Sequence, residues 1–301
     1  MKAAVVHGIL LLDKPLGLSS AGAVARAKRL FAARKAGHTG ALDPLATGLL
    51  PICFGEATKF GALMLEAGKT YRVTVRLGER TASADLESPV IEKRELPPLS
   101  RAGIEAALAE FPRSYPQVPP MHSAIKQDGK PLYEYARAGI TRERAARLIT
   151  IHDLQLRDWC APDLNFDVHV SKGAYIRVLA EDIALRLGTI AHVVGLRRLG
   201  VAPFLCEPLW TFAALEALDA PRRAQLLLPV DAALREWRRL DLPPAGVEAF
   251  RRGQTVSIPV GQPGTVRIYA TGHGFLGVGE IQATGSLVPV RLIAAAAANR
   301  A

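Results

Sequence analysis

The spacing of apolar residues predicts strands and helices that are interspersed along the chain. Residues 8–12 are almost continuously apolar, which is typical of a short buried strand, and residues 13–17 form a turn after it. Residues 71–77 alternate between apolar and polar side chains, which indicates a strand with one buried face. Further strands are predicted over residues 147–159, 164–170 and 192–199.

Helix signals lie between these strands. Ser19 and Ser20 can cap a helix over residues 21–33, and Ser100 can cap one that ends near residue 111. Gly188 closes a helix predicted over residues 174–187. Residues 58–65 are also predicted to be helical, and the proline-rich residues 112–120 to form an extended connector. Strands and helices do not alternate regularly, so the first 240 residues are predicted to be α+β.

The pattern changes after residue 204. Residues 209–239 are predicted to be helical, with breaks at Pro221 and Pro229, and residues 241–244 to be a linker. Short apolar segments separated by Gly and Pro follow over residues 246–293, which predicts a small β-rich domain. The expected domains are therefore residues 1–240 and 241–301.

Composition and charge narrow the class of protein. The 301 residues are 49% hydrophobic and 22% charged, and no apolar run reaches the ~18–20 residues of a membrane span. The formal net charge of +10 favours a polyanion as partner, nucleic acid before an anionic membrane, although a generically basic protein also fits. Three cysteines without a CxxC pair argue against a disulfide framework and agree with a cytoplasmic location.

The loop over residues 37–48 carries the densest set of chemically useful residues. It contains three glycines, and Pro44 restricts Asp43 to extended or turn geometry, so one carboxylate is held on a shaped loop. An ordinary Asp-Pro turn explains the same residues. The turn at residues 171–177 could hold a phosphate through its backbone and Lys172, but a simple helix cap with a surface arginine fits equally. The histidines lack metal-site spacing, so no metal is expected.

Several motifs occur together in a fixed order. They are Asp13-Lys14-Pro15, residues 36–48, residues 55–59, Lys69-x-Tyr71, residues 119–126, residues 171–177 and Leu196-Arg197-Arg198. Together they resemble the TruB-type tRNA pseudouridine synthases over nearly all of residues 8–204. The chain after residue 241 resembles the small PUA domain that often follows them and contacts RNA. The resemblance implies a central mixed or antiparallel sheet flanked by helices, followed by a PUA-like RNA-binding domain.

The resemblance also implies an activity and residues for it. It implies a monomeric isomerase that converts uridine to pseudouridine at position 55 in the T loop of tRNA, with no metal, organic cofactor, membrane or obligate protein partner. Asp43 matches the catalytic aspartate and Arg177 the arginine that partners it. The residues that match the lining of the flipped nucleotide are His38, Tyr71, Tyr175 and Leu196.

Three positions differ from the residues that are usual in this family. His122 stands where a tyrosine is usual, Ala174 where a threonine is common, and Ser88 where a glycine often occurs. Lys14 is expected to bind a phosphate.

The target base must leave its stack before any bond can change, and Tyr71 offers it a ring face in the pocket. Asp43 could then attack C1′ of the ribose or remove a proton from C2′, and both routes stay open. An arginine beside Asp43 favours its charged form, and Tyr71 is a candidate to relay the C5 proton. Two rival functions are a non-catalytic tRNA-binding or tRNA-folding module and a hydrolase, which would need a second carboxylate.

Overall fold

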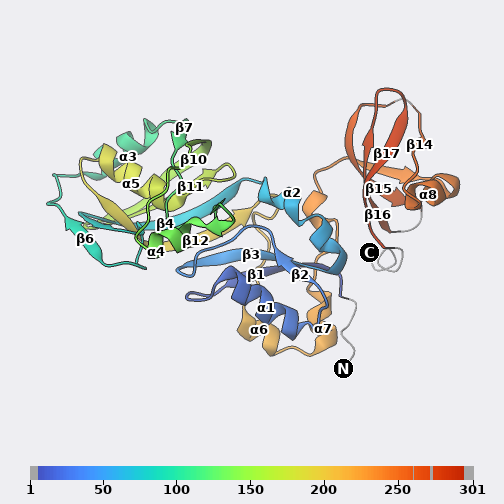
Figure 1. Ribbon diagram of the computed structural model, residues 1–301, viewed down its shortest axis with the longest axis horizontal. Coiled ribbons are helices and arrows are strands. Elements are labelled where there is room, and N and C mark those ends of the chain that lie inside the picture. Colours follow the sequence, from blue (N-terminus) through green and yellow to red (C-terminus); the bar gives the residue numbers. More distant parts are fainter. Residues whose placement is uncertain (1–5, 260, 272–273, 295–301) are drawn as a thin grey trace.

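The computed structural model describes residues 6–259, 261–271 and 274–294. Its larger part is built on an eight-stranded sheet with the order β1-β3-β12-β4-β11-β10-β7, and β2 pairs with β3 off this path (Figure 1). The strands are β1 (Gly8–Lys14), β2 (Ala36–His38), β3 (Ala46–Phe54), β4 (Lys69–Leu77), β7 (Ser114–Gln117), β10 (Arg147–Cys160), β11 (Asp163–Val170) and β12 (Ala191–Val201). Strands β3 and β12 run parallel and the other pairs are antiparallel, so the predicted mixed sheet is confirmed.

Strand β4 shows why the alternating pattern produces a two-faced sheet. Tyr71, Val73 and Val75 are buried on one face, as the pattern predicts. On the other face Arg72 and Arg76 pair across the strands with Asp167 and Asp163, at 2.9 Å in both cases. Cross-strand pairs of opposite charge stabilise neighbouring strands.

The three longest helices of this part of the chain contribute to the core on the apolar side of the sheet. They are α1 (Ser20–Leu30), α3 (Arg101–Ala109) and α5 (Ile176–Arg186). The Ser19 hydroxyl accepts a hydrogen bond from the Gly22 N–H and the Ser100 hydroxyl one from the Gly103 N–H, both at 3.1 Å, so the predicted serine caps are confirmed. Alanines of α1 and larger side chains of α3 and α5 join strand residues in one buried cluster.

Some segments differ from the sequence-based predictions. The predicted connector over residues 112–120 contains strand β7, whose backbone pairs with β10. Residues 55–65 form a 3₁₀ turn, η1 (Gly55–Lys59), and a separate short helix, α2 (Gly61–Leu65). Pro221 does not break a helix but lies in the first turn of α7 (Ala220–Gln225), where its missing N–H removes no helical bond.

Smaller elements complete this part of the chain. Strands β5 (Glu79–Thr81) and β6 (Val90–Lys93) form one pair, and β8 (Lys126–Gln127) and β9 (Lys130–Pro131) form another. The short helices α4 (Leu132–Arg137) and α6 (Phe212–Glu216) and the 3₁₀ turn η2 (Ala232–Leu234) lie in connecting segments. The helical prediction over residues 209–239 therefore holds only for short pieces.

The C-terminal part forms its own five-stranded sheet, with the order β13-β15-β16-β17-β14 (Figure 1). Its elements are β13 (Arg239–Leu242), α8 (Pro244–Arg251), β14 (Val256–Ser257), β15 (Gly264–Ala270), β16 (Phe275–Ile281) and β17 (Ser286–Leu292). The small β-rich domain is thus observed. The predicted linker at residues 241–244 is wrong, because Asp241 and Leu242 pair with β15 and Pro244 begins α8. The sheet begins at Arg239, two residues before the predicted domain start.

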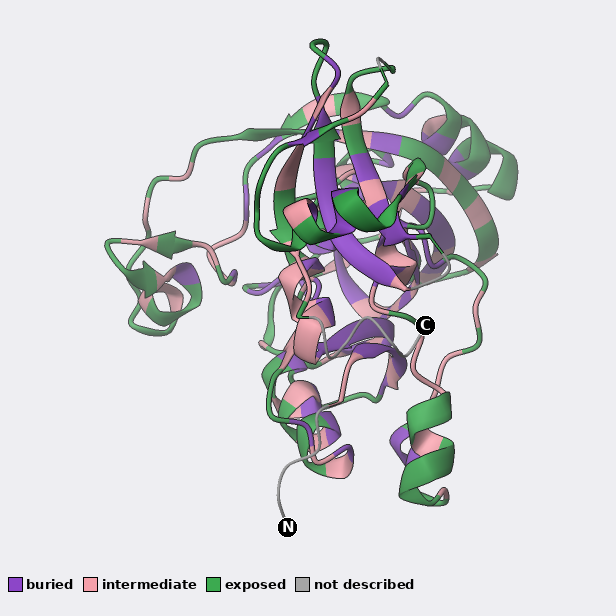
Figure 2. Cartoon of the chain, turned by 90° about the vertical axis from the view of Figure 1, so that its right-hand side faces the viewer, coloured by how far each residue is buried: buried purple, intermediate pink, exposed green. Residues whose placement is uncertain are grey.

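Aromatic packing joins this domain to the larger part of the chain. The Phe60 and Phe275 rings lie 5.5 Å apart and belong to a buried cluster with Tyr269, Leu234 and Val278. Buried residues concentrate along the strands, while the outer helix faces and loops are exposed (Figure 2). Among the described residues, no helix is both long and apolar enough to cross a bilayer.

Candidate active site

A cavity of about 290 Å³ lies where the loop before β3 meets β4, β12 and the start of α5. The residues that line it are Gly40, Ala41, Leu42, Asp43, Leu65, Lys69, Tyr71, Ser123, Ala124, Gly173, Ala174, Tyr175, Ile176, Arg177, Leu196 and Arg198. Apolar and aromatic side chains with a few convergent charged groups are typical of a small-ligand site. The structure therefore brings together five of the predicted residues: Asp43, Tyr71, Tyr175, Arg177 and Leu196.

Asp43 and Arg177 form an ion pair in this cavity. Asp43 Oδ2 lies 3.0 Å from Arg177 Nη2. The Asp43 side chain is 44% exposed, whereas that of Arg177 is only 6% exposed. The carboxylate thus faces the cavity while its cationic partner lies in the protein behind it.

The Arg177 guanidinium bridges Asp43 to groups deeper in the protein. Its Nη1 lies 3.1 Å from Oδ2 of the fully buried Asp85 and donates to the Ser83 carbonyl at 3.0 Å. Its Nη2 donates to the His122 carbonyl at 2.8 Å. A planar guanidinium presents several donors, so contacts from several directions fix the position of Arg177.

Asp85 was not predicted as a site residue, because nothing in residues 81–85 marks its carboxylate as buried beside Arg177. Two departures from the family pattern also touch this network. The Ser88 hydroxyl accepts from the Ser83 N–H at 2.8 Å. His122 contributes its main-chain carbonyl, so the histidine side chain in place of tyrosine leaves this contact intact.

A second buried arginine holds the loop that carries Asp43. Arg198 on β12 is fully buried and donates to the carbonyls of Leu49 at 2.7 Å, Gly40 at 3.1 Å and Ala41 at 3.3 Å. The end of the loop passes so close to β12 that a Cβ added at Gly48 would lie 2.2 Å from the Arg198 carbonyl oxygen. Gly48 also has a φ of +96°, so glycine is required there for two reasons.

Lys14 does not have the role predicted for it. Its side chain is fully buried, and Nζ donates to the carbonyls of Leu18 at 2.6 Å and Pro15 at 2.9 Å and, more weakly, to that of Pro44 at 3.4 Å. Burial lowers the pKa of Lys14 to about 8, although the nearby Asp43 carboxylate acts in the opposite direction. The predicted phosphate contact is therefore corrected: the three donors of Lys14 are already directed at the main chain, mainly at the segment that follows β1.

Tyr71 and Leu196 come from adjacent strands, β4 and β12, and both side chains are buried at the cavity. Tyr175 precedes α5, and burial raises its pKa. The Tyr175 N–H donates to Gln117 Oε1 at 2.8 Å, and Gln117 Nε2 donates to the Tyr175 carbonyl at 3.2 Å. Gln117 was not predicted as a site residue, because its segment was predicted to be a connector.

His38 lies outside the group that lines the cavity. It is an exposed residue at the end of β2, and its Nδ1 accepts a hydrogen bond from the Gly40 N–H at 3.3 Å. Partial burial, with a smaller contribution from Arg198, lowers the pKa of His38. Its position on the loop still places it near the Asp43 segment.

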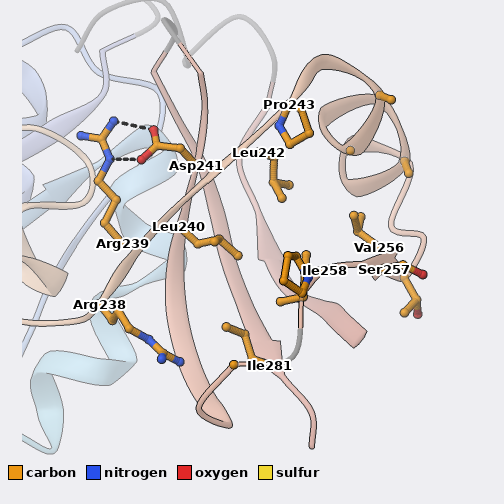
Figure 3. Close-up of a pocket in the computed structure, with 16 residues that line it drawn as sticks. Arg238, Arg239, Leu240, Asp241, Leu242, Pro243, Val256, Ser257, Ile258 and Ile281 are labelled. Atoms are coloured by element: carbon orange, nitrogen blue, oxygen red, sulfur yellow. Dashed lines mark hydrogen bonds and ion pairs between the residues drawn. The ribbon is translucent and has the colours of Figure 1, made fainter. Parts of the chain in front are cut away.

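A larger cavity of about 640 Å³ lies in the C-terminal domain. Leu240, Ile258 and Ile281 give it an apolar lining, and Arg239 binds Asp241 with two hydrogen bonds of 2.7 and 2.9 Å (Figure 3). An apolar lining with a paired acid offers little for covalent chemistry, so the smaller cavity is the candidate active site. Within the described residues, no three His, Cys, Asp or Glu side chains are grouped to hold a metal ion.

The geometry defines a site that can hold one small planar group between buried side chains, beside an anchored carboxylate. Comparison with known proteins identifies the class of protein that has this site. Residues 28–176 match the family model of the TruB family pseudouridylate synthase N-terminal domain. Residues 177–235 match the tRNA pseudouridylate synthase B C-terminal domain, and residues 239–293 match the C-terminal model of pseudouridine synthase II TruB.

Curated relatives match along nearly the full length. A tRNA pseudouridine synthase B of Sodalis glossinidius is 50% identical over 298 residues, covering 96% of both chains. One of Burkholderia mallei is 49% identical over 295 residues, covering 96% of this chain and 97% of the relative. The chain belongs to the TruB family of pseudouridine synthases.

Solved structures agree on the fold. A chain from a Cbf5-Nop10-Gar1 complex has a TM-score of 0.73 and 23% identity, covering 96% of this chain and 85% of that chain. A chain from an H/ACA RNP bound to a substrate RNA containing 2′-deoxyuridine has a TM-score of 0.72 and 21% identity, covering 96% of this chain and 86% of that one. The predicted pseudouridine synthase fold is confirmed.

Proposed function

We propose that this protein isomerises uridine to pseudouridine at position 55 in the T loop of tRNA, and that Asp43 is its catalytic residue. The observation that carries the proposal is the Asp43–Arg177 pair at a cavity lined by Tyr71 and Leu196. Relatives named tRNA pseudouridine synthase B support tRNA as the substrate. The choice of position 55 is supported by the family resemblance of the loop over residues 37–48.

The reaction makes limited demands on the protein. The C1′–N1 bond breaks, a C1′–C5 bond forms, N1 gains a proton and C5 loses one, so no redox partner is needed. The target base is extruded from the RNA and packs against Tyr71 in the cavity. Asp43 then acts at C1′ as a nucleophile or at C2′ as a base; both fit a carboxylate that faces the cavity.

The remaining residues have supporting roles in this proposal. Arg177 orients Asp43 and offsets the negative charge of both aspartates that it bridges. Tyr71 contacts the base and relays the C5 proton, while Tyr175 and Leu196 complete the walls of the cavity. His38 lies outside the cavity and is assigned to the space that the extruded nucleotide leaves in the RNA.

The decisive experiment uses Asp43→Asn, which keeps the shape of the side chain but cannot act as nucleophile or base. We expect tRNA binding within about threefold of wild type and a loss of turnover of at least about 10³-fold. Tritium release from C5-labelled uridine in tRNA measures the turnover. Asp163→Asn, on the polar face of the sheet, is the matched control and is expected to keep full activity.

The outcome also separates the rival functions. A near-normal rate of tritium release by Asp43→Asn would remove Asp43 from the mechanism. Tight tRNA binding by a wild-type protein that releases no tritium would favour a non-catalytic tRNA-binding module. Release of free uracil would identify a hydrolase instead. Mapping pseudouridine in tRNA treated with the wild-type enzyme tests the choice of position 55.

The proposal extends to the domains. Residues 1–240 are assigned to catalysis and residues 241–301 to RNA binding as a PUA-like domain, which the separate five-stranded sheet supports. The monomeric state stays a prediction, and sedimentation of the free protein checks it.

A further inference from the structure

One ion pair links two elements that border the active-site cavity. Lys172, in the turn between β11 and α5, pairs with Glu66, which follows the last residue of α2. The neighbours of this pair, Leu65 and Gly173, both line the cavity. The ion pair therefore lies at the rim of the site, where RNA must approach if the target nucleotide is to enter.

The two side chains are free to exchange partners. Lys172 is 58% exposed and Glu66 is 63% exposed, and exposed ion pairs of this kind are weak. Gly173 leaves open space beside Lys172, since a Cβ added there would meet nothing within 4 Å. A partner that reaches this rim can therefore displace Glu66 without disturbing the packing.

The charges around the rim favour an anionic partner. Lys69, at the same cavity, donates through Nζ to the carbonyls of Ala67 at 2.8 Å and Leu65 at 3.2 Å, so it is held in place. Burial and the nearby Arg198 lower the pKa of Lys69 to about 8, and the Glu66 carboxylate acts against that lowering. Glu66 is thus the carboxylate that pairs with Lys172 when RNA is absent.

We infer that Lys172 binds a backbone phosphate of the RNA at the rim of the cavity, and that Glu66 occupies this phosphate site in the free protein. The inference rests on the proposed function, because it requires RNA to be the substrate. When RNA binds, Lys172 exchanges the carboxylate for a phosphate oxygen, and Glu66 moves away from the incoming chain. Glu66 therefore lowers affinity for any RNA that does not place a phosphate at this rim.

The test is a double-mutant cycle with Glu66→Gln and Lys172→Gln in the full chain. The dissociation constant for a tRNA transcript is measured at several salt concentrations between about 0.05 and 0.2 M. We expect Glu66→Gln to bind about two- to fivefold more tightly at the lowest salt. We expect Lys172→Gln to bind more weakly and to reduce the slope of log Kd against log salt by about one.

The double variant tests whether Glu66 acts through Lys172. If Glu66 acts by occupying Lys172, the gain from Glu66→Gln disappears in the Lys172→Gln background. An equal gain in that background, or no gain in the wild-type background, would overturn the inference. Unchanged binding by Lys172→Gln would overturn it as well.

Two controls separate this result from other causes. Glu105→Gln removes the same charge from an exposed pair with Arg101 on α3, and we expect it to change the dissociation constant by less than the Glu66 variant. Tritium release by the wild-type enzyme tests the proposed function independently. An active wild type without the expected coupling would refute the phosphate site alone, whereas an inactive wild type would refute the proposed function.

Discussion

At the scale of single residues, buried cations organise this site. Arg177 joins the cavity-facing Asp43 to the fully buried Asp85, so two carboxylates depend on one guanidinium. Removing one partner of a buried ion pair is costly because the other charge is left without compensation. Arg177 therefore affects folding stability as well as the chemistry assigned to Asp43.

Arg177→Ala is expected to lower the free energy of unfolding by about 3–5 kcal/mol, because Asp85 loses its cation in a buried environment. Urea denaturation measures this loss. Arg177→Lys is expected to recover only part of the stability, since a single ammonium cannot reach all the acceptors that the planar fork reaches. Wild-type stability of Arg177→Ala would show that the bridge contributes nothing.

At the scale of elements, α5 carries a residue of the active site and also a carboxylate whose burial is unfavourable. It places Arg177 in its first turn and carries Glu181 one turn further on. Burial raises the pKa of Glu181 to about 7, while Arg80 acts against this rise. The helix thus retains a carboxylate that loses hydration on folding.

Burial of the Glu181 carboxylate predicts that the stability of the protein depends on pH. The pKa of Glu181 is about 7 in the folded protein and near its ordinary 4.5 when unfolded, so the folded state binds more protons between these values. The contribution of Glu181 to stability therefore falls as pH rises from about 4.5 to 7.

Glu181→Gln is expected to be about 1–2 kcal/mol more stable than wild type at pH 8, after allowance for partial exposure, and nearly equal at pH 4. Urea unfolding at the two pH values measures this, with Glu105→Gln as an exposed control. An equal effect at both pH values would show that charge is not the cause.

The elements also show what a sequence can reveal. The strands of residues 8–12, 71–77, 147–159 and 164–170 and the serine-capped helices could be predicted, because their signals are local patterns and caps. Strand β7 could not be predicted, since the prolines of residues 112–120 suggest a connector and its partner β10 follows 30 residues later. Strand β13 was missed because its pairing with β15 also spans a long separation.

The site residues that stand in recognisable motifs could be predicted from the sequence. Asp43, Tyr71 and Arg177 stand in motifs and line the cavity as expected. Lys14 was misassigned because a lysine in a basic chain suggests phosphate, and only the fold reveals the carbonyls that surround it. Asp85 and Gln117 act through contacts with Arg177 and Tyr175, which are more than 50 positions away along the chain, and local patterns do not reveal such contacts.

At the scale of the whole molecule, the two parts of the chain are joined by side-chain packing and by a polar contact. Lys59 Nζ donates to the Leu292 carbonyl at 2.9 Å, beside the buried Phe60–Phe275 contact. Phe60 directly precedes α2, whose last residue, Leu65, lines the active-site cavity. The segment that holds the C-terminal domain is thus continuous with a wall of the site.

Phe275→Ala is expected to lower the free energy of unfolding by about 3 kcal/mol, because a buried ring loses its contacts with Phe60 and Tyr269. Urea unfolding measures this loss. Val290→Ala, at an exposed position in the same domain, serves as the control and is expected to change stability by less than about 0.5 kcal/mol. A loss below about 1 kcal/mol for Phe275→Ala would mean that the aromatic contact is not maintained in solution.

The buried cations at the site have one feature in common: Lys14, Arg177 and Arg198 all donate hydrogen bonds to main-chain carbonyls. A carbonyl is present whatever side chain a residue bears, so the scaffold around Asp43 does not record the identity of positions such as Ala41 or His122. Evolution, or a designer who wishes to change which RNA is accepted, can therefore alter these side chains while the reactive carboxylate keeps its supports.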